Sequence, residues 1–330
     1  MSLDPMSLDP MSLDAMSLDP MSLDALREPP PLAPGARVVM VCPSGPLGGP
    51  HELERAVSQA ESLGWDVTVG THVLARTGYV AGDDAQRGDD LLRAMGDDDI
   101  DGIWCIRGGY GAARLLPRVQ AALPSMRPKA LLGYSDITAL HAAWRRAGLV
   151  SFHGPTARSP LTAFTRAALV EVVQLGGAPT WQAAEALVVR GGRATGRLAG
   201  GNLALVASLC GTPWALDFRD AIVVLEDLNE AVYRLDRLFT QLRLAGAFAG
   251  CRALAIGHFT DCPDTNGDGT QSALTLVAEL AAALDVPALY GVPVGHIADQ
   301  STLPLGASAT LDADARTLQL HRQIPGRWPQ

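Results

Sequence analysis

Residues 129–138 read KALLGYSDIT, and this stretch indicates how the first half of the chain folds. The apolar run Ala130–Tyr134 has the length of a buried strand. Apolar side chains at helical spacing, from Ile137 to Trp144, then predict a helix over 136–147. A strand that passes directly into a helix is the repeating unit of an α/β layer.

The same alternation extends toward the N-terminus. Strands are predicted over 38–42, 67–69 and 103–106, and helices over 51–63 and 85–96. Alternating strands and helices favour a mostly parallel sheet. We place this first domain at residues 33–160.

The second half of the chain follows a connector, residues 161–192, with one predicted helix over 164–175. Strands are predicted over 195–199, 221–226, 252–258 and 288–292, and helices over 202–209, 231–244 and 273–284. Residues 307–321 alternate apolar and polar side chains, which is typical of an antiparallel hairpin. We place the second domain at residues 193–325.

Composition limits the classes of function. The 330 residues are 48% hydrophobic and 18% charged, enough for about two packed domains. The net charge of -9 argues against a general nucleic-acid binder. Residues 1–25 repeat the pentad MSLDP or MSLDA and contribute five of the acidic residues. With the Pro-rich residues that follow, we interpret 1–32 as a disordered tail and linker.

The sequence indicates a cytoplasmic protein that needs no metal or other cofactor. It lacks a signal peptide and an apolar run long enough to cross a bilayer, so no membrane partner is expected. The five cysteines are scattered and fit buried thiols better than disulfides or a zinc site. Residues 264–269 (DTNGDG) match half of a calcium loop, but Thr275 stands where that loop needs a carboxylate.

Ser135 lies where the strand of KALLGYSDIT meets its helix, at the carboxyl edge of the predicted sheet. Ligands of open α/β folds bind at this edge, and amides at a helix start can stabilise an oxyanion. The layout is that of a nucleophile elbow, although Ile137 breaks the pattern G-x-S-x-G. The alternative is that Ser135 or Asp136 only caps the helix.

Two further strand ends carry candidate site residues. Residues 107–111 (RGGYG) can expose amides to an oxyanion or a phosphate, or form a plain tight turn. Glu226 and Asp227 end the apolar strand at 221–226. Glu226 suits a carboxylate that orients a histidine, and the alternative is helix capping or pairing with Arg234 or Arg237.

The base that such a carboxylate would orient is one of seven histidines. His296 lies in the irregular segment GVPVGHIADQSTLPLG, and loops of this kind often carry catalytic residues. His258, at the end of a predicted strand, and His153 are competitors. Local sequence does not choose among the three.

Taken in order, the motifs resemble the LD-carboxypeptidases of serine peptidase family S66. They are APGARVVMVCPSGP, GIWCIRGGYGAARLLP, LLGYSDITALH, FHGP, GRLAGGNLALV, VLEDLNEAVYRLDR and GVPVGHIADQSTLPLG. The expected fold is an N-terminal Rossmann- or flavodoxin-like parallel-sheet domain. A smaller C-terminal α/β domain, partly antiparallel and barrel-like, would follow it.

The resemblance implies a triad in which Ser135 is the nucleophile, His296 the general base and Glu226 the residue that orients it. It implies oxyanion donors at the amides of Gly109 (or Gly108) and Asp136. The implied substrate is a murein tetrapeptide, cut before its terminal D-Ala during cell-wall recycling. Arg107 is a candidate for binding the D-Ala carboxylate.

Two alternatives remain at this point. The chain also resembles microcin C self-immunity peptidases, which cut a peptidyl- or aminoacyl-nucleotide amide and should need an aromatic platform such as Trp181 or Trp214. The second alternative is a non-catalytic protein that binds a small molecule through residues 107–111, here called the glycine turn. The family further suggests a homodimer.

Overall fold

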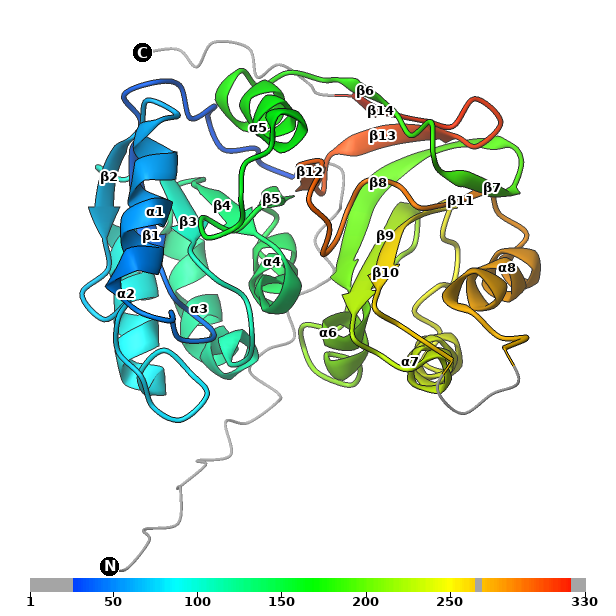
Figure 1. Ribbon diagram of the computed structural model, residues 1–330, viewed down its shortest axis with the longest axis horizontal. Coiled ribbons are helices and arrows are strands. Elements are labelled where there is room, and N and C mark those ends of the chain that lie inside the picture. The colour runs from blue at the N-terminus through cyan, green and yellow to red at the C-terminus, as the bar shows by residue number, and fades with distance from the viewer. Residues whose placement is uncertain (1–25, 265–268, 322–330) are drawn as a thin grey trace, which may run out of the picture.

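The computed structural model describes residues 26–264 and 269–321, which excludes the pentads. Its strands form a six-stranded and an eight-stranded sheet, which lie side by side (Figure 1). The first sheet is largely parallel and the second is mixed. The predicted α/β fold class is therefore confirmed.

The first sheet has the strand order β12-β5-β4-β3-β1-β2. Its strands are β1 (Arg37–Val41), β2 (Asp66–Val69), β3 (Gly102–Cys105), β4 (Ala130–Gly133), β5 (Ser151–His153) and β12 (Leu303–Leu305). All pairs from β5 to β2 are parallel, in the order of a flavodoxin-like sheet. The sixth strand, β12, comes from the far end of the chain and pairs antiparallel with β5.

Helices cover both faces of this sheet, which explains its continuously apolar strands. Met40 and Trp104 pack into one core cluster, while their neighbours Val41 and Cys105 pack into the other. Strands buried on both faces lose the apolar–polar alternation of a half-exposed strand. The surrounding helices are α1 (Pro50–Glu61), α2 (Asp84–Gly96), α3 (Leu116–Ala122) and α4 (Thr138–Arg146), of which α3 was not predicted.

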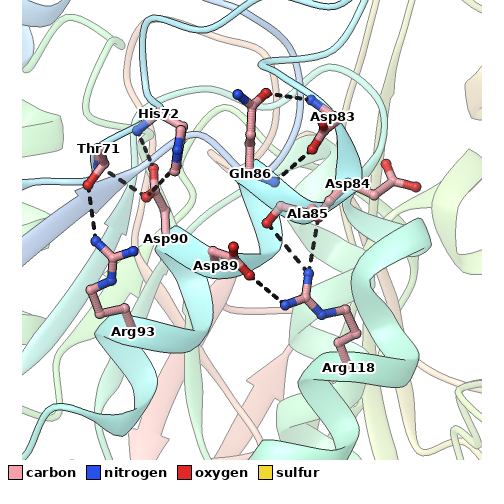
Figure 2. Close-up of polar contacts among 10 residues, drawn as sticks. All are labelled: Thr71, His72, Asp83, Asp84, Ala85, Gln86, Asp89, Asp90, Arg93 and Arg118. Atoms are coloured by element: carbon pink, nitrogen blue, oxygen red, sulfur yellow. Dashed lines mark hydrogen bonds and ion pairs between the residues drawn. The ribbon is translucent and has the colours of Figure 1, made fainter.

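Polar contacts fix α2 against its surroundings (Figure 2). Asp83 and Gln86 form a capping box at its start. The buried carboxylate of Asp90 accepts bonds from the amides of Thr71 and His72, at 3.1 and 2.7 Å, and so holds the loop after β2. This anchoring sets the position of α2, whose Arg87 donates to the carbonyl of Gly111 in the glycine turn.

The second sheet has the strand order β6-β14-β13-β8-β9-β10-β11-β7. Its strands are β6 (Thr180–Gln182), β7 (Leu187–Arg190), β8 (Arg193–Asn202), β9 (Ala221–Leu228), β10 (Ala253–Thr260), β11 (Ala288–Tyr290), β13 (Ser308–Asp312) and β14 (Thr317–His321). The four strands from β8 to β11 are parallel, and β13 and β14 form the predicted antiparallel hairpin. On one side of the sheet lie α6 (Leu203–Ser208), α7 (Val232–Leu244) and α8 (Ala273–Leu284) (Figure 1).

The segment 161–192, expected as a connector with one helix, contains more structure than predicted. It holds α5 (Ala163–Leu169), a π-helical continuation to Gln174, and then β6 and β7. These two strands occupy opposite edges of the second sheet although residues 183–186 alone separate them. The sheet therefore curls toward a barrel. The domain limits 33–160 and 193–325 remain a prediction.

Residues 26–32, expected as part of a linker, pack against the folded body. The amide of Arg27 donates to the carbonyl of Gly148, and that of Leu32 donates to Val173. The indole of Trp65 donates to the Leu32 carbonyl at 2.8 Å. This proline-rich segment is therefore ordered, because its backbone amides and carbonyls form hydrogen bonds with the folded body.

Candidate active site

Ser135 sits at the turn between β4 and α4 with a left-handed backbone, φ 65°. This conformation costs a non-glycine residue about 1–2 kcal/mol. The glycine turn comes so close that a Cβ at Gly108 would lie 2.9 Å from the Cβ of Ser135. Only glycine at position 108 allows this approach. The strained strand-to-helix turn is that of a nucleophile elbow, reached without the motif G-x-S-x-G.

The glycine turn is fixed from several sides. The Gly45 amide donates to the Gly108 carbonyl at 3.1 Å. Buried Arg87 of α2 donates to the carbonyl of Gly111 at 2.9 Å and to that of Pro43. These bonds join the turns after β1 and β3 into one rigid wall beside Ser135.

Asp136 connects the nucleophile turn to the glycine turn. Its carboxylate accepts a bond from the Ala112 amide at 2.9 Å, and its burial raises the pKa of the carboxyl group. Among the described residues, no side chain makes a capping hydrogen bond at the start of the 3-10 turn 135–137 or of α4, which follows it. The capping alternative for Ser135 and Asp136 is therefore wrong.

Glu226 and His296 form a hydrogen-bonded pair. Oε2 of Glu226 lies 2.8 Å from Nδ1 of His296, and the carboxylate is fully buried on β9, which continues two residues beyond the predicted end at 226. A Cβ at Gly295 would lie 2.9 Å from Oε2, so the residue before the histidine must be glycine. With its proton on Nδ1, the imidazole donates to Glu226 and leaves Nε2 able to accept a proton. Arg234, an alternative partner for Glu226, pairs instead with Glu230.

The loop that carries His296 is held by contacts with distant segments. The hydroxyl of Thr260 on β10 donates to the His296 carbonyl at 3.1 Å. Buried Thr165 of α5 donates to the Ala298 carbonyl at 3.0 Å and accepts from the Gln300 amide at 2.9 Å. An irregular loop is thereby fixed at a defined place.

Ser135 and His296 line the same pocket, which has a volume of about 670 Å³. Arg107, Gly108 and Gly109 also line it. The volume is that of a small-molecule site. The predicted nucleophile, base, glycine turn and arginine therefore share one cavity, while the buried Asp136 is not part of its lining.

The two competing histidines lie elsewhere. Neither His153 nor His258 lines the pocket, and burial lowers the pKa of both, that of His153 to about 3. His153 contacts Tyr134, whose ring also packs against His296 with the centroids 4.8 Å apart. A neutral, buried His153 supports the wall behind the site.

Asn202 is a pocket residue that sequence reasoning missed. It ends β8, caps α6 and donates to Asp227 at 2.8 Å. Asp227 also accepts from the Ala204 and Leu228 amides, and burial raises its pKa to about 6. The polar residue at a strand end was the available signal, but β8 continues to Asn202, where a helix was predicted to begin.

No cluster of histidine, cysteine or carboxylate side chains that could hold a metal ion occurs in residues 26–264 and 269–321. Most of the half calcium loop, residues 265–268, lies outside the described residues.

Comparison with known proteins shows to which family the chain belongs. The family model for the LD-carboxypeptidase N-terminal domain matches residues 38–154, and the model for the C-terminal domain matches residues 195–311. This chain belongs to the LD-carboxypeptidase family. It is a carboxypeptidase of the serine-hydrolase type.

Individual relatives of this LD-carboxypeptidase agree with the family. The murein tetrapeptide carboxypeptidase of Pseudomonas aeruginosa is 36% identical over 290 residues, which cover 84% of this chain and 94% of the relative. The crystal structure of muramoyltetrapeptide carboxypeptidase from Oxalobacter formigenes has a TM-score of 0.77 at 29% identity, covering 86% of this chain and 98% of that chain.

A second solved structure shares the fold. MccF in complex with glutamyl sulfamoyl guanosine has a TM-score of 0.81 at 23% identity, covering 89% of this chain and 98% of that chain. At this identity the likeness concerns the fold alone. In the described part of this LD-carboxypeptidase, no helix is long and apolar enough to cross a membrane.

Proposed function

We propose that the protein hydrolyses the L,D-peptide bond to the terminal D-Ala of a murein tetrapeptide, through a triad of Ser135, His296 and Glu226. The observation that carries this proposal is the 2.8 Å contact between Glu226 and His296, with His296 in the pocket that Ser135 lines. The strained backbone of Ser135 supports its role as the nucleophile.

The reaction is acyl transfer in two steps. His296 Nε2 takes the proton from Ser135 as Oγ attacks the scissile carbonyl carbon, and Glu226 stabilises the resulting imidazolium. The amides of Gly109 (or Gly108) and Asp136 stabilise the tetrahedral oxyanion. The intermediate collapses, His296 protonates the leaving amine, and free D-Ala departs. Water then attacks the acyl-enzyme with His296 again as base, which restores Ser135.

The substrate class comes from the relatives and fits the pocket. The Pseudomonas aeruginosa relative is named a murein tetrapeptide carboxypeptidase. Arg107, at the glycine turn, supplies a cation for the D-Ala carboxylate next to the pocket-lining residues Gly108 and Gly109. The proposed setting is cell-wall recycling in the cytoplasm.

The pocket favours this substrate over an aminoacyl-nucleotide. Trp181 is buried on β6, Trp214 donates to Gln120, and neither lines the pocket. Tyr134 is its aromatic lining residue and packs against His296. The stacking platform expected for a nucleotide is therefore not formed by either tryptophan.

The test is turnover followed by mass spectrometry, with murein tetrapeptide and an aminoacyl-sulfamoyl adenylate as separate substrates. We expect tripeptide and free alanine from the first, and Ser135→Ala to abolish their formation. Cleavage of the adenylate alone would move the protein to the immunity-peptidase function. Tetrapeptide binding without cleavage, and unchanged by Ser135→Ala, would point to a binding protein.

A further inference from the structure

The turn 156–160 forms the part of the pocket wall that lies next to the glycine turn. Four of its five residues line the pocket, and one of them is Arg158. The Arg158 amide donates to the carbonyl of Ile106 at 3.0 Å. Because Ile106 directly precedes Arg107, this bond sets the two arginines side by side at the end of β3.

A glutamine of α1 holds Arg158 from both flanks. Nε2 of Gln59 donates to the carbonyls of Ala157 and Ser159, at 2.6 and 3.1 Å. Oε1 of the same side chain accepts from the Leu161 amide at 3.1 Å. Three bonds from one amide group leave the turn little freedom, so Arg158 is presented to the pocket from a preorganised backbone.

Positive charge dominates this side of the pocket. Arg55, Arg107 and Arg158 line it together with a single carboxylate, Glu52, whose Oε1 lies 3.5 Å from Arg158. The guanidinium of Arg107 donates to the Pro46 carbonyl but makes no ion pair with any residue in 26–264 and 269–321. Its burial and the neighbouring charge of Arg158 lower its pKa. An excess of guanidinium groups over carboxylates is stabilised by a bound anion.

The opposite wall does not compete for that anion. Its charged residue is Asp227, whose carboxylate already accepts bonds from Asn202, Ala204 and Leu228. An anionic group of a ligand is repelled there and attracted to the arginines.

We propose that Arg158 joins Arg107 in binding the C-terminal carboxylate of the peptide substrate, and that this pair restricts the enzyme to the end of the peptide chain. The inference rests on the proposed function. A peptide bond inside a chain offers a neutral amide at the same place, which leaves both guanidinium groups without the substrate's anion. Glu52 is the counter-ion that orients Arg158 before substrate binds.

The test compares a murein tetrapeptide with a free C-terminal carboxylate and the same peptide with a C-terminal carboxamide. Wild type, Arg158→Gln and Arg158→Lys are assayed for kcat/KM on both, with Arg166→Gln of α5, outside the pocket, as the matched control. We expect wild type to prefer the acid by about 10- to 100-fold, the range for a hydrogen bond to a charged group. Arg158→Gln should lose most of this preference through KM, and Arg158→Lys should lose less.

The outcomes are separable. Activity on the carboxamide should be the same in wild type and Arg158→Gln, and Arg166→Gln should match wild type on both peptides. Equal losses on acid and carboxamide, or no loss, would overturn the role of Arg158. If wild type cleaves both peptides equally well, the proposed function stands and the carboxylate clamp is wrong. If it cleaves neither, the proposed function itself is wrong.

Discussion

The two sides of the pocket position their reactive groups in different ways. On the side of the first sheet, Ser135 is held by strain in its own backbone and by a glycine turn that lies against it. On the side of the second sheet, His296 has no comparable strain and is fixed by a carboxylate, Glu226, and by hydroxyl groups from other elements. Local geometry thus presents the nucleophile, whereas long-range contacts present the base.

On each side, a buried carboxylate also ties together the turns that surround the pocket. Asp136 joins the nucleophile turn to the glycine turn, and Asp227 joins the ends of β8 and β9. Burial raises the pKa of both groups. The two sides therefore use the same kind of interaction to frame the site, between partners that lie similarly far apart along the chain.

The largest expected effect concerns Ser135. Ser135→Ala should reduce kcat by about 10⁴- to 10⁶-fold, because the attacking oxygen is lost, with KM for tetrapeptide little changed. Single-turnover assays by mass spectrometry measure this. A rate within tenfold of wild type would remove Ser135 from the mechanism.

A matched variant, Ser135→Gly, separates strain from chemistry. Both variants should be inactive, but glycine adopts φ 65° without a Cβ penalty. The free energy of unfolding of Ser135→Gly should therefore exceed that of Ser135→Ala by up to about 1 kcal/mol, as measured by denaturant titration. If Ser135→Gly is instead less stable than Ser135→Ala by about 0.5–1 kcal/mol, which is the cost of the flexibility of glycine alone, the nucleophile side is not strained.

Glu226→Gln probes the other side and should lower kcat by about 10⁴-fold. A glutamine amide can donate to Nδ1 of His296, which favours the tautomer whose Nε2 carries the proton and cannot act as base. Glu226→Asp, which keeps the charge on a shorter side chain, should retain more activity. Similar rates for wild type and Glu226→Gln would contradict the role of the pair.

Asp227, on the side of the second sheet, should make the stability of the protein depend on pH. Its pKa is raised to about 6 from 3.8, so the folded protein holds this proton more tightly than the unfolded chain does. The resulting stabilisation is complete below about pH 4 and is lost as the pH rises through 6. The free energy of unfolding of wild type, relative to Asp227→Asn, should fall by about 2–3 kcal/mol between pH 4 and 7.

Denaturant titrations across this pH range measure the difference. Asp217→Asn, which removes an exposed carboxylate, controls for the loss of one negative charge. Parallel pH profiles for wild type and Asp227→Asn would contradict the effect of burial on Asp227.

The smallest expected effect concerns the distant contacts of the His296 loop. Thr165→Val keeps the shape of the side chain but removes the hydroxyl that bonds to Ala298 and Gln300. We expect kcat to fall about tenfold with KM unchanged, because a small displacement of the base slows proton transfer. Thr165→Ser should restore the rate.

Thr240→Val, on the exposed side of α7, is the matched control and should have the wild-type rate. If Thr165→Val changes thermal stability but not kcat, the threonine supports the fold without positioning the base.

The amino-acid sequence is sufficient to predict most of the regular structure. Strands β1, β3 and β4 are predictable because fully apolar runs next to amphipathic helices have few other folds open to them. The antiparallel hairpin at the end is equally clear from its alternation. The positions of Ser135 and Glu226 at strand ends, together with the order of the motifs, are enough to indicate the family.

What the tertiary structure decided depends on contacts between distant parts of the chain. Strand β12, three residues that contain a proline, was not predicted, because it is a strand only through its pairing with β5. Short strands β6 and β7 carry no periodicity long enough to recognise. Likewise, local sequence does not distinguish His296 from His153 or His258, whereas burial and the Glu226 contact do. Arg158 has no motif at all, and its place beside Arg107 follows from one backbone bond between segments about 50 residues apart.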